Sequence, residues 1–225
     1  MYSVKRNAEV VIVIKKKYQV FVSSTYLDLK EERSSVISAI LDMGCIPVAM
    51  EQFPAGPQNQ WEYIKEMILE SDYVVLIVAG CYGTLDKMEK ISFTEKEFDF
   101  ACSIKKPVLP FIISNPDNLI VSKTERTRPK KEKLETFVEK IKDSGCLVKF
   151  YDNTDDLRCK VVTSLQTCIE RMPGIGWVRA DQIETFANKM RSMPDKFGEI
   201  NIDDMIPCYE PITEERMKMI APKQN

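Results

Sequence analysis

The chain has 225 residues, enough for one well-buried domain with an appendage but not for two full domains. Hydrophobic residues make up 44% and charged residues 29% of it, as in an ordinary globular protein. The formal charge of −2 gives no overall field that would attract nucleic acid or an anionic membrane, and the absence of histidine excludes Ser–His and Cys–His pairs and histidine metal sites. We therefore expect no direct nucleic-acid binding, no membrane association and no metal site.

The sequence also predicts where the protein works. Its longest apolar runs, residues 10–14 and 73–79, are far shorter than the ~20 residues that span a bilayer, and its first residues do not resemble a signal peptide. Seven scattered cysteines without a CxxC pair indicate reduced thiols rather than a disulfide framework. We expect a cytoplasmic protein.

Strands and helices are expected to alternate along most of the chain. After an N-terminal strand or arm (residues 1–17), apolar runs predict buried strands, and helical spacing of apolar residues predicts helices between them. Ser24 and Thr25 are expected to cap the first helix, and Gly44 to end it. The strands are expected at residues 19–23, 45–50, 72–80, 107–113 and 146–150, and the helices at residues 27–43, 61–68, 93–104, 133–143 and 155–171.

This alternation predicts an α/β domain at residues 18–172. Short connections and right-handed crossovers favour a flavodoxin-like, five-stranded parallel sheet of order 2-1-3-4-5 with helices on both faces. Residues 114–132 are polar, proline-containing and basic, and are expected to form an exposed, mobile excursion. Residues 173–225 are expected to form a C-terminal extension, with a helix at residues 180–193, that packs on the domain or on a partner.

In such a sheet the functional crevice lies at the carboxyl ends of the strands, near the switch point between the first and third strands. Five segments converge there: residues 23–25, 51–53, 80–84, 92–97 and the loop after residue 113. The chain has neither GxGxxG after its first strand nor GxxxxGK[ST], which excludes a standard Rossmann dehydrogenase and a P-loop NTPase. Ser24 and Thr25 are either helix caps alone or caps that also contact a ligand.

The most informative stretch is residues 92–101, SFTEKEFDFA. Ser92 and Thr94 each precede a glutamate by three residues, so two overlapping capping boxes predict the start of a helix. Glu97 falls at helical spacing among apolar residues, on the face expected to point toward the core. Its carboxylate is therefore either a cap or a working group, with Glu95 and Glu51 as competitors.

The same residues carry a family resemblance. The segments VFVSST (20–25) with Asp28 and EER (31–33), AGCYG (79–83), SFTEKEFDFA (92–101), PVLPF (107–111) and GWVRA (176–180), in this order, resemble a TIR-like family of bacterial domains long labelled as of unknown function. Members often precede signalling NTPase modules in prokaryotic immune proteins. The resemblance implies a flavodoxin-like fold, self-association and a possible signalling NTPase partner.

The resemblance also implies an activity. Catalytic TIR domains cleave the bond between nicotinamide and ribose in NAD, with an essential glutamate near the start of the helix after the third strand, and Glu97 occupies that position. NAD would be the substrate, and no cofactor is implied. One carboxylate can stabilise or trap the oxocarbenium-like ribose that nicotinamide leaves behind. The residues expected to bind the substrate are Ser23, Ser24, Thr25, Phe53, Tyr82, Gly83, Ser92 and Phe93.

Two alternatives remain open. The first is a non-catalytic TIR-like interaction and oligomerisation module in which Glu97 only caps its helix. The second is an enzyme similar to nucleoside deoxyribosyltransferases, which share the general layout and also act on an N-glycosidic bond with a glutamate.

Overall fold

The computed structural model describes residues 15–52 and 59–183. The chain divides into two units, Lys17–Gly176 and a second that comprises the two ends of the chain, Met1–Lys16 with Trp177–Asn225. Phe53 lies outside the described residues, as do most of the expected N-terminal strand and C-terminal helix. The fold below is that of residues 17–176.

Five parallel strands form one sheet in the order β2-β1-β3-β4-β5, so the predicted flavodoxin-like order 2-1-3-4-5 is confirmed. The strands are β1 (Gln19–Ser24), β2 (Ile46–Val48), β3 (Tyr73–Val78), β4 (Val108–Ile113) and β5 (Lys149–Tyr151). The helices are α1 (Lys30–Asp42), α2 (Gln60–Glu70), α3 (Phe93–Ser103), α4 (Arg128–Asp143) and α5 (Thr154–Arg171), with short 3-10 turns η1 (Met50–Gln52), η2 (Pro116–Asn118) and η3 (Val121–Lys123).

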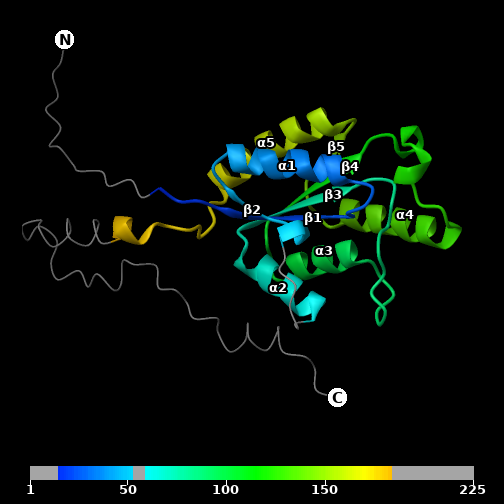
Figure 1. The fold of residues 1–225 in the computed structure, drawn as a ribbon, viewed down its shortest axis with the longest axis horizontal. Helices are drawn as coiled ribbons and strands as arrows, with labels where there is room; N and C mark the ends of the chain where they lie inside the picture. The colour runs from blue at the N-terminus through cyan, green and yellow to red at the C-terminus, as the bar shows by residue number, and fades with distance from the viewer. Residues whose placement is uncertain (1–14, 53–58, 184–225) are drawn as a thin grey trace, which may run out of the picture. The chain divides into compact units, whose positions relative to one another are not determined.

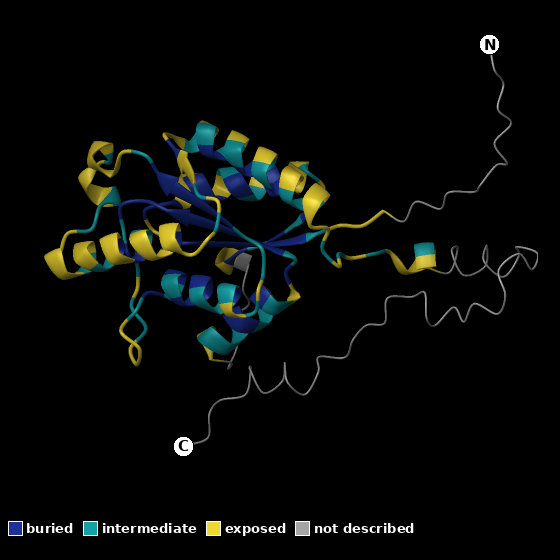
Figure 2. Ribbon diagram, turned by 180° about the vertical axis from the view of Figure 1, so that it is seen from behind, coloured by how far each residue is buried: buried dark blue, intermediate teal, exposed yellow. Residues whose placement is uncertain are grey.

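Helices cover both faces of the sheet. Figure 1 shows α1 and α5 together on one face and α2, α3 and α4 on the other. The central strands β1 and β3 are buried along their whole length, as expected of parallel strands between two helical layers. Their side chains alternate between the two cores: Val20 and Val22 pack toward α1 and α5, whereas Phe21 packs toward α2 and α3. Figure 2 shows these strands in dark blue between helices whose outer surfaces are exposed.

Residues 114–132 are mostly exposed, as predicted, but they contain more regular structure than the predicted excursion. They contain η2, η3 and the first residues of α4, which begins five residues before the predicted start at residue 133. Pro129 lies in the first turn of α4, where a missing backbone N–H costs no helical hydrogen bond. Thr124 forms a parallel bridge with Gly80, and the N–H of Glu125 donates to the Gly80 carbonyl at 2.7 Å. This segment is therefore joined to the end of β3.

Replacing Gly80 with alanine should lower the free energy of unfolding by about 2 kcal/mol. A Cβ atom at this position would lie 2.3 Å from the backbone oxygen of Lys123, so the bridged segment would have to move away and lose its bond to Gly80. Urea-induced unfolding of both proteins measures the difference. An unchanged unfolding midpoint would contradict the close approach.

No helix among the described residues is long and apolar enough to cross a membrane.

Candidate functional site

The two serines at the end of β1 point to opposite faces of the sheet and reach different partners. Ser23 follows Phe21 toward the α3 side, where its hydroxyl donates to Oε2 of Glu97 at 2.5 Å. Ser24 follows Val22 toward the α1 side, where its hydroxyl accepts a hydrogen bond from Nη1 of Arg33 at 2.8 Å. Because successive side chains of a strand point to opposite faces, the end of β1 contacts a charged residue from the helical layer on each face. We call Ser23, Ser24, Arg33, Glu51 and Glu97 the Glu97 cluster.

Glu97 lies in the first half of α3 and is 8% exposed. Burial raises its pKa to about 7, whereas the hydrogen bond from Ser23 and the positive charge of Arg33 act in the opposite direction. Ser92, not Glu97, caps the helix: the Ser92 hydroxyl accepts from the N–H of Glu95 at 3.1 Å. The carboxylate of Glu97 is therefore a buried group that titrates near neutral pH and is directed at the end of β1.

Arg33 is the residue of this cluster that the sequence analysis did not select. Its side chain is 1% exposed and binds both carboxylate oxygens of Glu51, with Nε and Nη2 each 2.6 Å from an oxygen. It also donates to Ser24 and, at 3.4 Å, to the Val22 carbonyl. Burial raises the pKa of Glu51, but the hydrogen bonds to its carboxylate and the positive charge of Arg33 together outweigh burial, so this pKa lies below its usual value. Glu51 thus follows β2 as the partner of a buried arginine.

The charged neighbours of Glu97 on α3 are directed elsewhere. Glu95 accepts a hydrogen bond from the hydroxyl of Tyr82 and pairs with Lys140 at 2.9 Å. Lys96 is buried, with its ammonium over the ring of Trp61 at 4.4 Å and paired with Asp86 and Glu89 at 3.1 and 2.8 Å. Of these three charged residues of α3, only Glu97 is directed toward Ser23.

Gly44, with φ of +74°, follows the C-cap of α1 as expected, but the expected N-caps Ser24 and Thr25 are wrong. The N-cap is Leu29, without a side-chain hydrogen bond, because the strand continues through Ser24 before the chain turns. The Thr25 hydroxyl instead donates to Asp28 at 3.0 Å. Gly83 lies beside Thr25, since a Cβ atom on Gly83, which has φ of +94°, would be 2.8 Å from the Thr25 methyl group. Thr25 and Gly83 thus meet in the loops that follow β1 and β3.

The other predicted substrate contacts surround the start of α3. Ser92 is fully buried as the cap. Tyr82 is buried in the core on the α4 side, with its ring 6.4 Å from that of Phe137, and burial raises the pKa of its hydroxyl to about 12. Phe93 packs with α2 and α3 in the core beside Phe21. The structure therefore brings Ser23 and Ser24 into the cluster with Glu97, and it holds Tyr82, Ser92 and Phe93 in contacts of their own.

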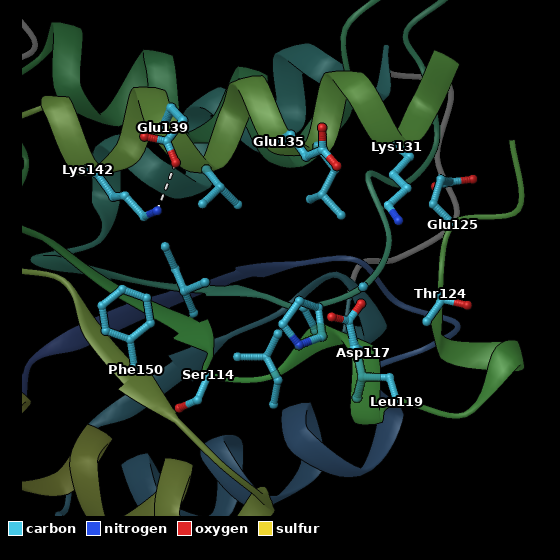
Figure 3. Close-up of a pocket in the computed structure, with 17 residues that line it drawn as sticks. Ser114, Asp117, Leu119, Thr124, Glu125, Lys131, Glu135, Glu139, Lys142 and Phe150 are labelled. Atoms are coloured by element: carbon cyan, nitrogen blue, oxygen red, sulfur yellow. Dashed lines mark hydrogen bonds and ion pairs between the residues drawn. The ribbon is translucent and has the colours of Figure 1, made fainter. Parts of the chain in front are cut away.

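A cavity of about 650 Å³ lies elsewhere, along α4 and the carboxyl ends of β3 and β4 (Figure 3). Lys131, Glu135 and Phe150 are among the residues that line it, as are Gly80 and Ser114 from two of the segments expected at the crevice. Of the predicted catalytic and substrate-binding residues that the structure describes, none lines it. Glu125 also lines the cavity and contacts the loop after β3, because its carboxylate accepts a hydrogen bond from the N–H of Tyr82 at 3.1 Å. The cavity and the Glu97 cluster are separate features of the same sheet edge.

The sheet order and the buried carboxylate at its switch point define a flavodoxin-like α/β domain with a polar cluster at the carboxyl end of β1. The chain belongs to the family described as "Domain of unknown function (DUF4062)", which matches residues 19–166. A comparison with curated proteins gave no match.

A solved structure titled "Structure of the activated Roq1 resistosome directly recognizing the pathogen effector XopQ (TIR domains)" contains a similar chain. The similarity covers 68% of this chain and 99% of that chain, with 13% sequence identity and a TM-score of 0.45.

Proposed function

We propose that this protein is a TIR-like NAD⁺ glycohydrolase that cleaves the N-glycosidic bond between nicotinamide and ribose, with Glu97 as the catalytic carboxylate. The observation that carries the proposal is the buried Glu97 side chain held by Ser23 at the carboxyl end of β1. This is the edge of a doubly wound sheet at which ligands bind. It is also the position of the essential glutamate in the catalytic TIR domains that the sequence resembles.

The chemistry requires one carboxylate and no histidine. When the bond from C1′ to the nicotinamide nitrogen breaks, its electron pair goes to the nitrogen, and the positively charged ring leaves as a neutral base. The ribose is left as an oxocarbenium-like cation, which the ionised Glu97 stabilises or traps until water adds to C1′ and releases a proton. The positive ring of the bound substrate favours the ionised form of a carboxyl group whose pKa is about 7.

The neighbouring polar groups have supporting roles in this proposal. The Ser23 hydroxyl fixes the orientation of the carboxylate, and Ser24, Thr25 and Gly83 lie where the loops after β1 and β3 can contact ribose or phosphate oxygens. In the cell, such an enzyme would be a cytoplasmic effector of prokaryotic antiviral defence that works after self-association or beside a signalling NTPase module.

Nicotinamide release from NAD⁺ tests the proposal. Glu97→Gln should reduce turnover by about 100-fold or more, because the amide cannot stabilise a cation as a carboxylate does. Glu95→Gln is the matched control on the same helix turn: Glu95 binds Tyr82 and Lys140 instead of Ser23, so this variant should keep most of the activity. Wild type is measured at low and high protein concentration, because assembly is expected to be required.

Two outcomes would contradict the proposal. Turnover that survives in a folded Glu97→Gln variant would exclude Glu97 as the catalytic group. A wild-type protein that is inert at every concentration would favour the interaction module, and exchange of bases on a deoxynucleoside would favour the deoxyribosyltransferase-like enzyme.

A further inference from the structure

The Glu97 cluster contains two carboxyl groups and one guanidinium group. Glu51 and Arg33 form a bidentate pair, so ionisation of Glu97 leaves the cluster with a net negative charge. Other charged groups on the surrounding elements have partners of their own: on α3, Glu95 pairs with Lys140 and Lys96 with Asp86 and Glu89, and on α2, Lys65 pairs with Glu62 at 2.7 Å. Beside Arg33 on α1, the buried Glu32 pairs with Lys123 at 2.7 Å. Arg33 is therefore paired with Glu51, and its positive charge also favours the ionised form of Glu97.

We propose that Glu51 is a positioning residue that sets, through Arg33, the fraction of Glu97 that is ionised before substrate binds. The proposal rests on the proposed function, since it concerns the same carboxylate. Glu51 acts in two ways. It holds the guanidinium group of Arg33 beside the end of β1 with two hydrogen bonds of 2.6 Å. Its negative charge also offsets the positive charge of Arg33, which would otherwise favour the ionised form of Glu97.

The geometry explains why the effect reaches Glu97 and is not lost to solvent. The Arg33 side chain is 1% exposed, so its interactions are screened by water far less than those of a surface pair. Ser24 and Ser23 are consecutive residues, bound to Arg33 and Glu97 respectively, so the two charged groups flank the same strand end. Since the charge of Arg33 favours the ionised form of Glu97, a change in the charge balance at Glu51 is expected to alter the ionisation of Glu97.

This arrangement favours a cationic substrate. Free enzyme near neutral pH holds Glu97 partly protonated, and a positively charged nicotinamide ring restores the charge balance and ionises it. A neutral N-glycoside such as NADH or a deoxynucleoside brings no such charge. The charge balance of the cluster therefore selects N-ribosyl compounds whose base carries a positive charge while it is bonded to ribose.

The test compares Glu51→Gln with Glu62→Gln. Both changes remove one negative charge from a carboxylate paired with a buried cation, and the two side chains are similarly exposed, at 27% and 29%. The pKa of Glu97 is read directly from its side-chain carboxyl ¹³C resonance during a pH titration, with the signal assigned by its absence in Glu97→Gln. The turnover rate of NAD⁺ is measured in parallel as a function of pH, and the acidic side of this pH–activity profile (its acid limb) is compared between the variants.

Glu51→Gln should lower the pKa of Glu97 from about 7 to about 6 and move the acid limb equally, because Arg33 becomes uncompensated. Glu62→Gln should leave both unchanged. Arg33→Gln, where it folds, should shift the pKa upward. An unchanged Glu97 resonance titration in Glu51→Gln, or equal shifts in the two Gln variants, would overturn the inference. The titration needs no activity, so an inert wild type would overturn the proposed function without deciding this one.

Discussion

Replacing Arg33 with methionine is expected to lower the free energy of unfolding by about 3 kcal/mol at neutral pH. The methionine fills much of the buried volume, but Glu51 loses two hydrogen bonds and Ser24 loses its donor. The expected loss is at the low end for a broken buried pair because the Glu51 side chain is 27% exposed and can turn toward water. Urea-induced unfolding at pH 7 measures it.

Arg158→Met is the control for this substitution. Arg158 is likewise an arginine with a carboxylate and a carbonyl partner, joining α5 to Asp42 and the Ser35 carbonyl of α1, but its side chain is 34% exposed. An exposed pair contributes about 1 kcal/mol or less. If both variants lose the same stability, the Arg33 pair behaves as a surface contact and its central position in the cluster is refuted.

Glu97→Gln is expected to gain stability relative to wild type as the pH rises. The carboxyl group of Glu97 has a pKa of about 7 in the folded protein and ordinarily one of 4.5, so between these pH values the native state binds more protons than the unfolded state. The free energy of unfolding of wild type therefore falls as the pH rises through this window. The total loss is about 3 kcal/mol, is complete above pH 7, and is absent when residue 97 is glutamine.

Unfolding of both proteins in urea at pH 5 and pH 8 gives the comparison. Relative to wild type, the free energy of unfolding of Glu97→Gln should be higher at pH 8 than at pH 5 by up to about 3 kcal/mol. A difference that does not change with pH would show that Glu97 titrates as an ordinary carboxylate. Together with the expected loss of turnover, the gain would identify Glu97 as a residue kept for function at a cost in stability.

The sheet could be predicted from the sequence because its signals are local and strong. Residues 73–78 are apolar on both faces, which indicates a central parallel strand, residues 20–22 form a shorter apolar run, and the helices between the strands have regular apolar spacing. The start of α4 differs from the prediction because Pro129 lies in a polar, proline-containing segment that favours a loop, although proline also fits the first turn of a helix.

The candidate site was predicted in part. Ser92 was expected to cap α3 and does so, because a capping box depends only on residues within one turn. The partners of Ser23 and Ser24 could not be predicted, since they come from α3 and α1 and depend on how the layers pack. A signal for Arg33 was present: it shares a helix face with Val36 and Ile40, and a cation on an apolar stripe indicates a buried ion pair.

The two serines at the end of β1 have one more consequence. Consecutive strand residues face opposite ways, so inserting or deleting a single residue in β1 would exchange the groups presented to Glu97 and Arg33 and dismantle the cluster while the sheet could still form. Grafting this cluster onto another flavodoxin-like scaffold would therefore require matching the strand register at one position on both faces. Copying either helix alone would not transfer it.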